Sequence, residues 1–106
     1  MAEGNPFDEA FRRISARFRA DRAGDTRAVV HWRLTDWGPD EYARYEMVIE
    51  DGHIAVRPGR TRDAHVTVTL SAPEFLRMAG QPELFLSGRL RGDTARAATL
   101  PGLFTT

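Results

Sequence analysis

The N-terminal quarter of the chain carries the spacing of an amphipathic helix. Its large apolar residues recur at intervals of four, three and four: Phe7, Phe11, Ile14 and Phe18. This spacing places them on one narrow helical face. Asn5-Pro6 is a helix start and Gly24 a helix stop, so we expect one continuous helix between them. We expect its phenylalanines to pack on a core, with contact to a membrane surface as the alternative.

From residue 30 onward the apolar period changes to two, which is typical of half-buried strands. Four such stretches carry Val30, Trp32 and Leu34; Ala43, Tyr45, Met47 and Ile49; Ile54 and Val56; and Val66, Val68 and Leu70. Residues 35–41 have turn composition, and Asp51-Gly52 predicts a tight hairpin turn. Residues 27–70 therefore predict an antiparallel meander with one apolar and one polar face. We expect His31 and His65 to be solvated on the polar face, and Glu46 to face outward.

Capping signals divide the last third of the chain. Ser71 and Glu74 form a capping box, which predicts a short helix that closes at Gly80. A second helical turn after Pro82 carries residues 84–86, and residues 87–91 form a final edge strand. Asp93 is expected to cap a last helix that runs through residue 98. Three apolar residues near the C-terminus are then expected to dock on the core: Leu100, Leu103 and Phe104.

Length and charge narrow the class of protein. The 106 residues suit one domain, 1–106, and 15 basic residues balance 15 acidic ones. A net charge of zero argues against nucleic acid as a partner. No segment reads as a signal peptide or as a membrane span, so we expect a cytoplasmic protein without stable membrane insertion. Every basic residue is arginine and cysteine is absent, which excludes lysine Schiff-base and thiolate chemistry.

The titratable residues give weak support to catalysis. His31, His53 and His65 lack metal-ligand spacing, and Ser71 and Ser87 lack the context of a nucleophile. Asp40, Glu41 and Glu46 could each supply a carboxylate base, but two lie in a predicted turn and one on the polar strand face. We therefore predict no catalytic residue, no metal and no cofactor, and keep a hidden acid–base pair as the alternative.

Three segments, in their order and spacing, resemble the type-2 sterol carrier protein domain family. They are Glu50-Asp51-Gly52-His53-Ile54, the stretch 63–70 that leads into Ser71-Ala72-Pro73-Glu74-Phe75, and Phe85-Leu86-Ser87-Gly88-Arg89-Leu90-Arg91-Gly92-Asp93. The resemblance extends from about Phe7 to Phe104. The chain departs from the family at one point, because Arg91 directly precedes Gly92 where the family usually has two further residues. The last strand should therefore be short, or turn tightly into the helix.

The resemblance implies an α+β fold: a five-stranded, mostly antiparallel sheet with helices on one face around an apolar tunnel. It also implies a hydrophobic small molecule or lipid as partner, such as a fatty acid or a sterol-like lipid. The residues expected to bind it are Phe18, Trp32, Leu34, Tyr45, Met47, Ile49, Phe75, Met78, Phe85, Leu103 and Phe104. The alternatives are a biosynthetic enzyme or accessory protein that uses the same pocket, and a dimerisation module without ligand. We expect a monomer or a weak homodimer.

Overall fold

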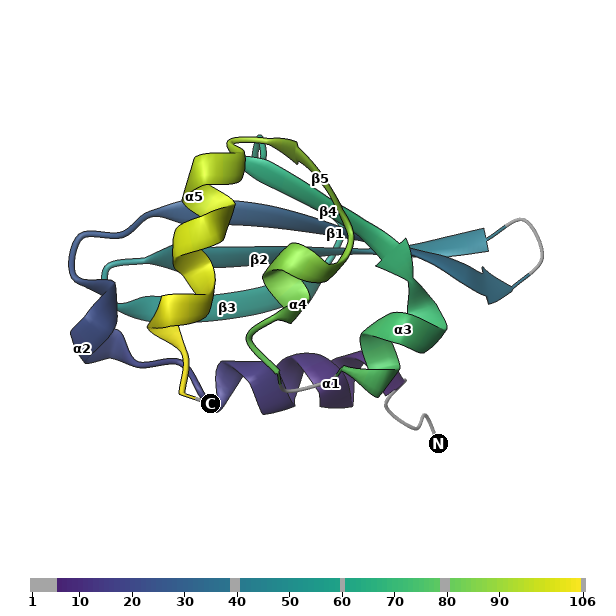
Figure 1. Ribbon diagram of the computed structural model, residues 1–106, viewed down its shortest axis with the longest axis horizontal. Helices are drawn as coiled ribbons and strands as arrows, with labels where there is room; N and C mark the ends of the chain where they lie inside the picture. Colours follow the sequence, from purple (N-terminus) through teal and green to yellow (C-terminus); the bar gives the residue numbers. More distant parts are fainter. Residues whose placement is uncertain (1–5, 39–40, 60, 79–80, 106) are drawn as a thin grey trace.

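The computed structural model describes residues 6–38, 41–59, 61–78 and 81–105. Along the chain, the elements are α1 (Pro6–Ser15), α2 (Ala20–Ala23), β1 (Ala28–Gly38), β2 (Glu41–Glu50), β3 (His53–Pro58), β4 (Val66–Ser71), α3 (Ala72–Arg77), α4 (Leu84–Ser87), β5 (Arg89–Gly92), α5 (Thr94–Thr99) and a 3-10 turn, η1 (Leu100–Leu103). The helices cover one face of a sheet, and the hydrophobic core lies between the two layers (Figure 1). The predicted α+β class is confirmed.

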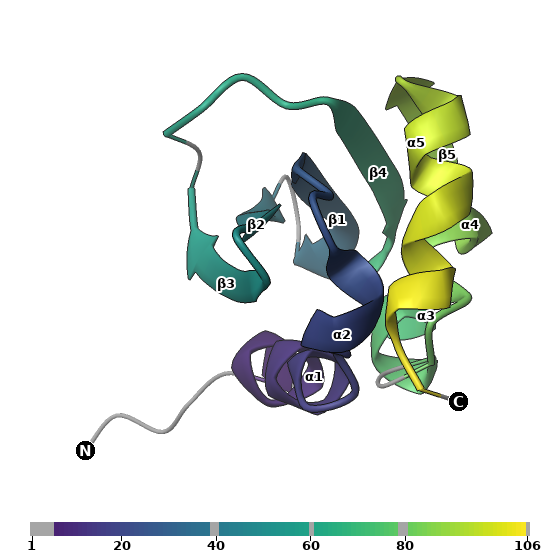
Figure 2. The same cartoon turned by 90° about the vertical axis from the view of Figure 1, so that its left-hand side faces the viewer.

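The sheet has five strands in the order β3-β2-β1-β4-β5. Three of its four pairings are antiparallel, and β1 pairs with β4 in parallel. The predicted meander over residues 27–70 is therefore wrong at its last strand. β3 occupies the free edge of β2, so β4 takes the other edge of β1, and the chain crosses the sheet between them (Figure 2). Apolar periodicity reports the buried face of a strand but not its neighbour.

The predicted continuous helix to Gly24 is also wrong, because α1 ends at Ser15 and α2 begins only at Ala20. Between them, the main chain pairs with the C-terminal segment. Arg19 N donates to Leu103 O at 2.7 Å, and Thr105 N donates to Arg17 O at 2.8 Å. These long-range hydrogen bonds replace the helical ones, and they set Phe18 opposite Phe104 in an isolated bridge.

Strand structure also extends further than the turn composition of residues 35–41 predicts. β1 continues to Gly38 and β2 begins at Glu41, so most of the predicted turn is strand. The pairing is irregular between Leu34 and Gly38, and Asp36 has a φ of 59°. A bulge of this kind accommodates turn-forming residues, and aspartate tolerates the left-handed region better than most side chains.

The local capping signals are confirmed. The Ser71 side chain accepts a hydrogen bond from Glu74 N at 3.2 Å, and the Asp93 side chain accepts one from Arg96 N at 2.9 Å. The Asp51-Gly52 turn has φ values of 53° and 73°, as the hairpin signal requires. The predicted end of the helix at Gly80 lies outside the described residues.

Two glycines let β5 approach β4 closely. A Cβ at Gly88 would lie 2.3 Å from Thr69 O, and one at Gly92 would lie 2.5 Å from His65 O. Gly92 also has a φ of 101°, which turns the chain directly into the Asp93 cap. β5 is four residues long, so the short strand expected from the Arg91-Gly92 junction is confirmed.

Candidate functional site

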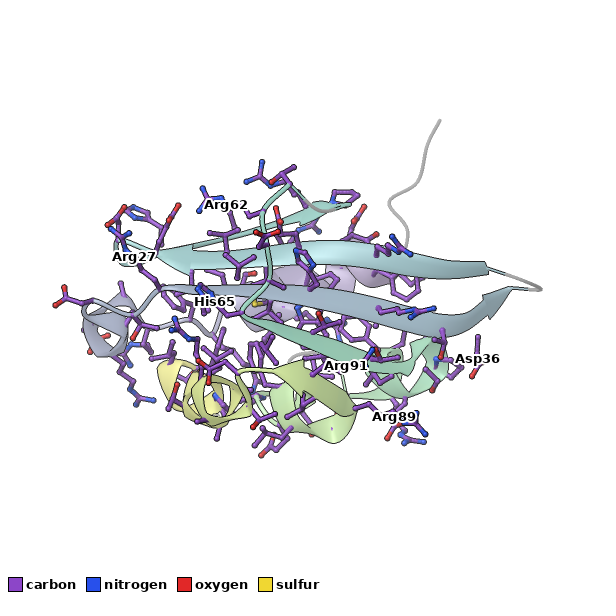
Figure 3. All side chains as sticks on the ribbon, turned by 90° about the horizontal axis from the view of Figure 1, so that it is seen from above. Arg27, Asp36, Arg62, His65, Arg89 and Arg91 are labelled. Carbon is purple, nitrogen blue, oxygen red and sulfur yellow. The ribbon has the colours of Figure 1, made fainter. Side chains whose placement is uncertain are left out.

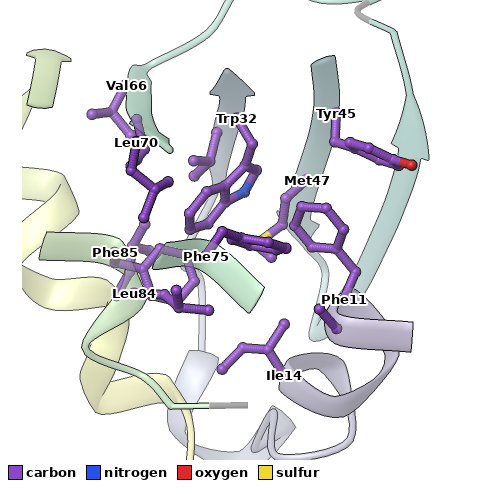
Figure 4. Close-up of a cluster of buried hydrophobic side chains, with 14 of the residues drawn as sticks. Phe11, Ile14, Trp32, Tyr45, Met47, Val66, Leu70, Phe75, Leu84 and Phe85 are labelled. Carbon is purple, nitrogen blue, oxygen red and sulfur yellow. The ribbon is translucent and has the colours of Figure 1, made fainter. Parts of the chain in front are cut away.

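Seven buried aromatic side chains lie in the layer between the sheet and the helices. Six of them form a continuous series that we call the aromatic row, and Phe7 packs beside it against Tyr45 and Phe75. The strands contribute Trp32 from β1 and Tyr45 from β2, because alternate residues of each strand face the helices. The helices and the C-terminal segment contribute the rest: Phe11, Phe75, Phe85 and Phe104. Each of the six is at most 5% exposed. Most of them are labelled in Figure 4.

The rings of the aromatic row touch one another in sequence. Ring centroids are 4.8 Å apart between Phe11 and Tyr45, and 4.9 Å apart between Phe11 and Phe75. Trp32 lies 5.8 Å from Phe75 and 5.4 Å from Phe85. Phe85 and Phe104 follow at 5.2 Å. All five are tilted ring contacts, and they lie in the layer in which the resemblance places a tunnel.

The structure brings the eleven predicted ligand-binding residues to one core. Nine of them are buried: Trp32, Leu34, Tyr45, Met47, Ile49, Phe75, Phe85, Leu103 and Phe104. Phe18 and Met78 are partly buried and pack against these nine. The predicted set lacks Phe7 and Phe11, which belong to the same core, although their helical spacing marked both as core residues. The role of this set in binding stays a prediction.

Trp32 carries an unsatisfied polar group. Its side chain is 1% exposed, and its Nε1 is the one buried side-chain nitrogen or oxygen without a hydrogen-bond partner among the described residues. The neighbouring rings offer no lone pair. An unmet buried donor typically costs about 1–3 kcal/mol, and nearly all such groups in proteins are satisfied.

A groove leads from the surface to one end of the aromatic row. It has a volume of about 280 Å³ and lies between α1 and the strands β2 and β3. Phe11 and Tyr45 line it together with Asp8, Val56 and Pro58, among others. The Tyr45 hydroxyl donates to the Asp8 carboxylate at 3.4 Å, so the tyrosine spans from the core to the groove. This groove brings solvent close to rings that are otherwise buried.

The opposite face of the sheet holds a buried carboxylate. Glu46 faces outward as alternation predicts, but it is covered there. Glu46 has no exposed surface, because residues 61 and 62 cover it. Its oxygens accept hydrogen bonds from Thr61 N at 2.9 Å, Thr61 Oγ1 at 2.8 Å and Arg62 N at 2.9 Å. His31 Nε2 lies at 3.2 Å and Arg57 Nε at 3.5 Å. The carboxylate therefore holds the crossover between β3 and β4 against the sheet.

Two opposing effects set the acidity of Glu46. Burial raises the pKa of the carboxyl group, but the hydrogen bonds from Arg62, Thr61 and His31 outweigh burial and lower the pKa to about 2. The carboxylate is therefore charged at neutral pH. Strand alternation places it on the side of the sheet away from the aromatic row.

The expectation of solvated histidines is wrong for both His31 and His65. The His31 side chain is only 12% exposed beside Glu46. His65 is half-buried, and its Nδ1 accepts a hydrogen bond from Val29 N at 2.9 Å. Alternation correctly places His31 on the outer face, but it carries no information about the loop that covers that face. Within the described residues, no group of three or more His, Cys, Asp or Glu side chains could hold a metal ion.

Comparisons with solved structures give the same fold. The chain is similar to the S233Y F250G double mutant of the sec-alkyl sulfatase PisA1, with a TM-score of 0.74 and 22% identity over 93% of this chain and 16% of that one. It is also similar to the stereoselective inverting sec-alkylsulfatase Pisa1 from Pseudomonas sp., with a TM-score of 0.67 and 22% identity over 88% of this chain and 15% of that one. The chain thus spans a small part of either sulfatase. No curated protein sequence matches it.

The family comparison covers nearly the whole chain. Residues 7–105 match the SCP-2 sterol transfer family, a range that includes every described strand and almost all of α1. In the part of the chain that the structure describes, no helix has the length and apolar character needed to cross a bilayer. The matched range also contains all eleven predicted binding residues and the short β5 strand. On this match, the chain belongs to the SCP-2 sterol transfer family.

Proposed function

We propose that this protein binds a hydrophobic small molecule, such as a fatty acid, a sterol-like lipid or a similar metabolite, between the sheet and the helices. The observation that carries the proposal is the buried Trp32 indole N–H, which has no acceptor among the described residues. Membership of the SCP-2 sterol transfer family supports the same conclusion.

The indole N–H defines what the ligand should offer. A neutral ligand oxygen, such as a hydroxyl or a carbonyl, would accept this hydrogen bond and remove the cost of the unmet donor. A charged carboxylate is a poorer occupant at that depth, because one neutral donor does not offset its loss of hydration. For a fatty acid we therefore expect the carboxylate to remain in the groove while the chain lies along the rings.

A ligand can enter only if the rings of the aromatic row move apart. The short helices that cover the row are suited to such movement. α3, α4, α5 and η1 contain four to six residues each, so little of their stability comes from their own helical hydrogen bonds. The groove beside α1 already reaches Phe11 and Tyr45, and Phe11 lies 5.8 Å from Trp32 between ring centroids. Met47 and Met78 add side chains that adapt to varied shapes. A ligand that separates Phe11 from Phe75 would reach the indole.

We propose binding and not a reaction of the bound ligand. The buried carboxylate of Glu46 and its neighbour His31 lie on the outer face of the sheet, across it from the aromatic row. If no ligand binds, dimerisation without a ligand becomes the better explanation, and the following experiment distinguishes the two.

The test combines native mass spectrometry with a displacement assay. Protein purified gently from a lipid-containing host should retain a hydrophobic mass, and it should bind fluorescent cis-parinaric acid. Dodecanol and dodecane should both displace the probe. Trp32→Phe should lower the affinity for dodecanol about tenfold and the affinity for dodecane much less, because only the alcohol accepts the indole hydrogen bond.

The comparison of the alcohol with the alkane controls for the space that Trp32→Phe opens, since both ligands meet the same altered pocket. If Trp32→Phe lowers the affinity for both ligands equally, Trp32 is not the polar contact. If no mass is retained and the probe does not bind, the proposal fails and the interaction module becomes the better account.

A further inference from the structure

One row of polar side chains crosses the outer face of the sheet, and the proposed function does not use it. Strand register gives its order from β3 to β5: Arg57, Glu46, His31, Thr67 and Arg91. We call these five residues the outer row. Neighbouring strands lie about 4.8 Å apart, so adjacent side chains of the row are close enough to interact. Figure 3 looks onto this side of the sheet, with Arg91 labelled.

The contact between Glu46 and His31 determines which ring nitrogen of the histidine carries a proton. His31 Nε2 lies 3.2 Å from a Glu46 oxygen. The carboxylate is charged and has only acceptors, so Nε2 carries the proton and donates it to Glu46. In the neutral ring, Nδ1 then holds a lone pair. The two ring nitrogens face nearly opposite directions, so Nδ1 faces away from Glu46.

His31 Nδ1 has no hydrogen-bond partner among the described residues, and it reaches solvent. The solvent contact follows because Trp32 Nε1 is the one buried side-chain nitrogen or oxygen in the described chain that lacks a partner. Two hollows, of about 230 Å³ and 780 Å³, open over this part of the sheet, and His31 and Thr67 line both. The histidine and the threonine therefore share the same solvent-accessible space.

Glu46 is held firmly enough to orient the His31 ring. The carboxylate is fully buried, and donors from Thr61 and Arg62 lie 2.8 to 2.9 Å from its oxygens. A buried carboxylate that accepts from one nitrogen of a histidine fixes the tautomer and the orientation of the ring. It also stabilises the positive charge that arises when the other nitrogen takes up a proton. The pair is therefore built to accept a proton at Nδ1.

Arg91 adds a positive charge to the space that His31 faces. It lines the smaller hollow together with His31 and Thr67. No ion pair within the described part of the chain involves Arg91. Two strand spacings separate Arg91 from His31, roughly 10 Å along the row. A molecule of a few atoms in the hollow would therefore lie between the histidine and the guanidinium.

We propose that the outer row hydrolyses small carboxylic esters, with His31 as the general base. His31 Nδ1 takes a proton from a water molecule while the water oxygen bonds to the carbonyl carbon of the ester. The carbonyl oxygen gains negative charge, which the Arg91 guanidinium stabilises. The bond from carbon to the alcohol oxygen then breaks, and the proton on His31 passes to the departing alkoxide. The products are a carboxylic acid and an alcohol.

The other members of the outer row act through these two. The Thr67 hydroxyl is the neighbour of His31 across the β1–β4 pairing, where it is placed to hold the attacking water. Glu46 is a positioning residue, because it touches the histidine and not the ester. The row lies across the sheet from the aromatic row, so this activity is independent of the proposed lipid site.

The experiment measures hydrolysis of 4-nitrophenyl acetate by the full chain at pH 8, followed by the absorbance of the released 4-nitrophenolate. His31→Gln should lower kcat/KM at least about tenfold, since general-base catalysis contributes about 10²–10⁴-fold. Arg91→Gln should also lower kcat at least about tenfold, because it removes the charge that faces the oxyanion. His53→Gln is the matched control and should leave the rate unchanged. The His53 ring is exposed, and its Nδ1 lies 2.8 Å from the Asp51 carbonyl oxygen with no carboxylate to orient it.

A second measurement tests the geometry in the original protein, where no variant has to fold. Long-range ¹H–¹⁵N spectra distinguish the two neutral tautomers of a histidine ring. At pH 8 the His31 ring should carry its proton on Nε2 and leave Nδ1 unprotonated. The spectrum of His31→Gln assigns the signals of His31.

Three results would overturn the proposal. They are hydrolysis no faster than with free imidazole at the same concentration, equal rates for His31→Gln and His53→Gln, and a proton on Nδ1 of His31. Saturating dodecanol should leave the rate of hydrolysis unchanged, whereas inhibition by dodecanol would move the reaction to the aromatic row and also contradict the proposal. Displacement of cis-parinaric acid should be unchanged in His31→Gln, so the ester site and the lipid site can each fail alone.

Discussion

The buried carboxylate of Glu46 should make the stability of this protein depend on pH in a calculable way. In the folded protein its pKa is about 2, against an ordinary value of 4.5. The difference of about 2.5 units, at 1.36 kcal/mol per unit, corresponds to roughly 3 kcal/mol of folding free energy. That is a large share of the about 5–15 kcal/mol by which a domain is stable.

The sign follows from the direction of the shift. The folded protein holds the proton less tightly than the unfolded chain, so the contribution is complete above pH 4.5 and is lost as the pH falls toward 2. Glu46→Gln removes the charge and places an amide N–H₂ against donors from Thr61 and Arg62. We expect the free energy of unfolding of this variant to be about 3 kcal/mol below that of the original protein at pH 7. Below pH 4.5 this difference should become progressively smaller.

The assay is urea denaturation of both proteins at pH 7, 5, 4 and 3. The difference in unfolding free energy should hold steady between pH 7 and 5 and then narrow, because only the original protein takes up a proton at this position. Glu50→Gln is the control, since its carboxylate pairs with Arg62 at the surface and should matter far less. A difference that stays constant down to pH 3, or a Glu46 effect no larger than that of Glu50, would refute the reasoning.

Two further substitutions test local features of the fold by thermal or urea denaturation. Ser71→Ala should cost about 1 kcal/mol through loss of the cap on Glu74 N, and an unchanged midpoint would contradict the cap. Gly92→Ala should cost about 1–3 kcal/mol from its φ of 101° alone, with more from the contact with His65 O. Gly102→Ala is the matched control, because no neighbouring atom lies within 4 Å of its added Cβ. Equal stability of the two glycine variants would contradict the close approach of β5 to β4.

The sequence predicted the features that depend on neighbouring residues. The caps at Ser71 and Asp93 and the turn at Asp51-Gly52 are each made within a few residues, so composition identifies them. Strand period placed Trp32 and Tyr45 on the buried face, since that assignment needs only alternation.

The predictions that were wrong concern features that depend on segments far apart in the chain. The break after Ser15 comes from main-chain hydrogen bonds with residues near the C-terminus, which helical spacing cannot reveal. The parallel pairing of β4 with β1 depends on which sheet edge is free. Glu46 is on the polar side of its strand, as alternation indicates, but it is buried because residues 61 and 62 fold over it.

The candidate site was predictable as a set of residues but not as a geometry. Alternation and helical spacing identified nearly all members of the core, because burial of apolar side chains is the strongest signal in the chain. The missing acceptor for the Trp32 indole depends on which atoms surround Nε1, and no sequence pattern contains that information.

The central claim is that a hydrophobic molecule binds between the sheet and the helices and meets Trp32. The most direct measurement is a ¹H–¹⁵N correlation spectrum of the indole N–H groups during titration with dodecanol. The chain has two tryptophans, and the spectrum of Trp32→Phe assigns the signal of Trp32. We predict that this signal moves downfield and saturates as the ligand oxygen accepts the hydrogen bond. A Trp32 indole signal that stays in place throughout the titration would contradict the account.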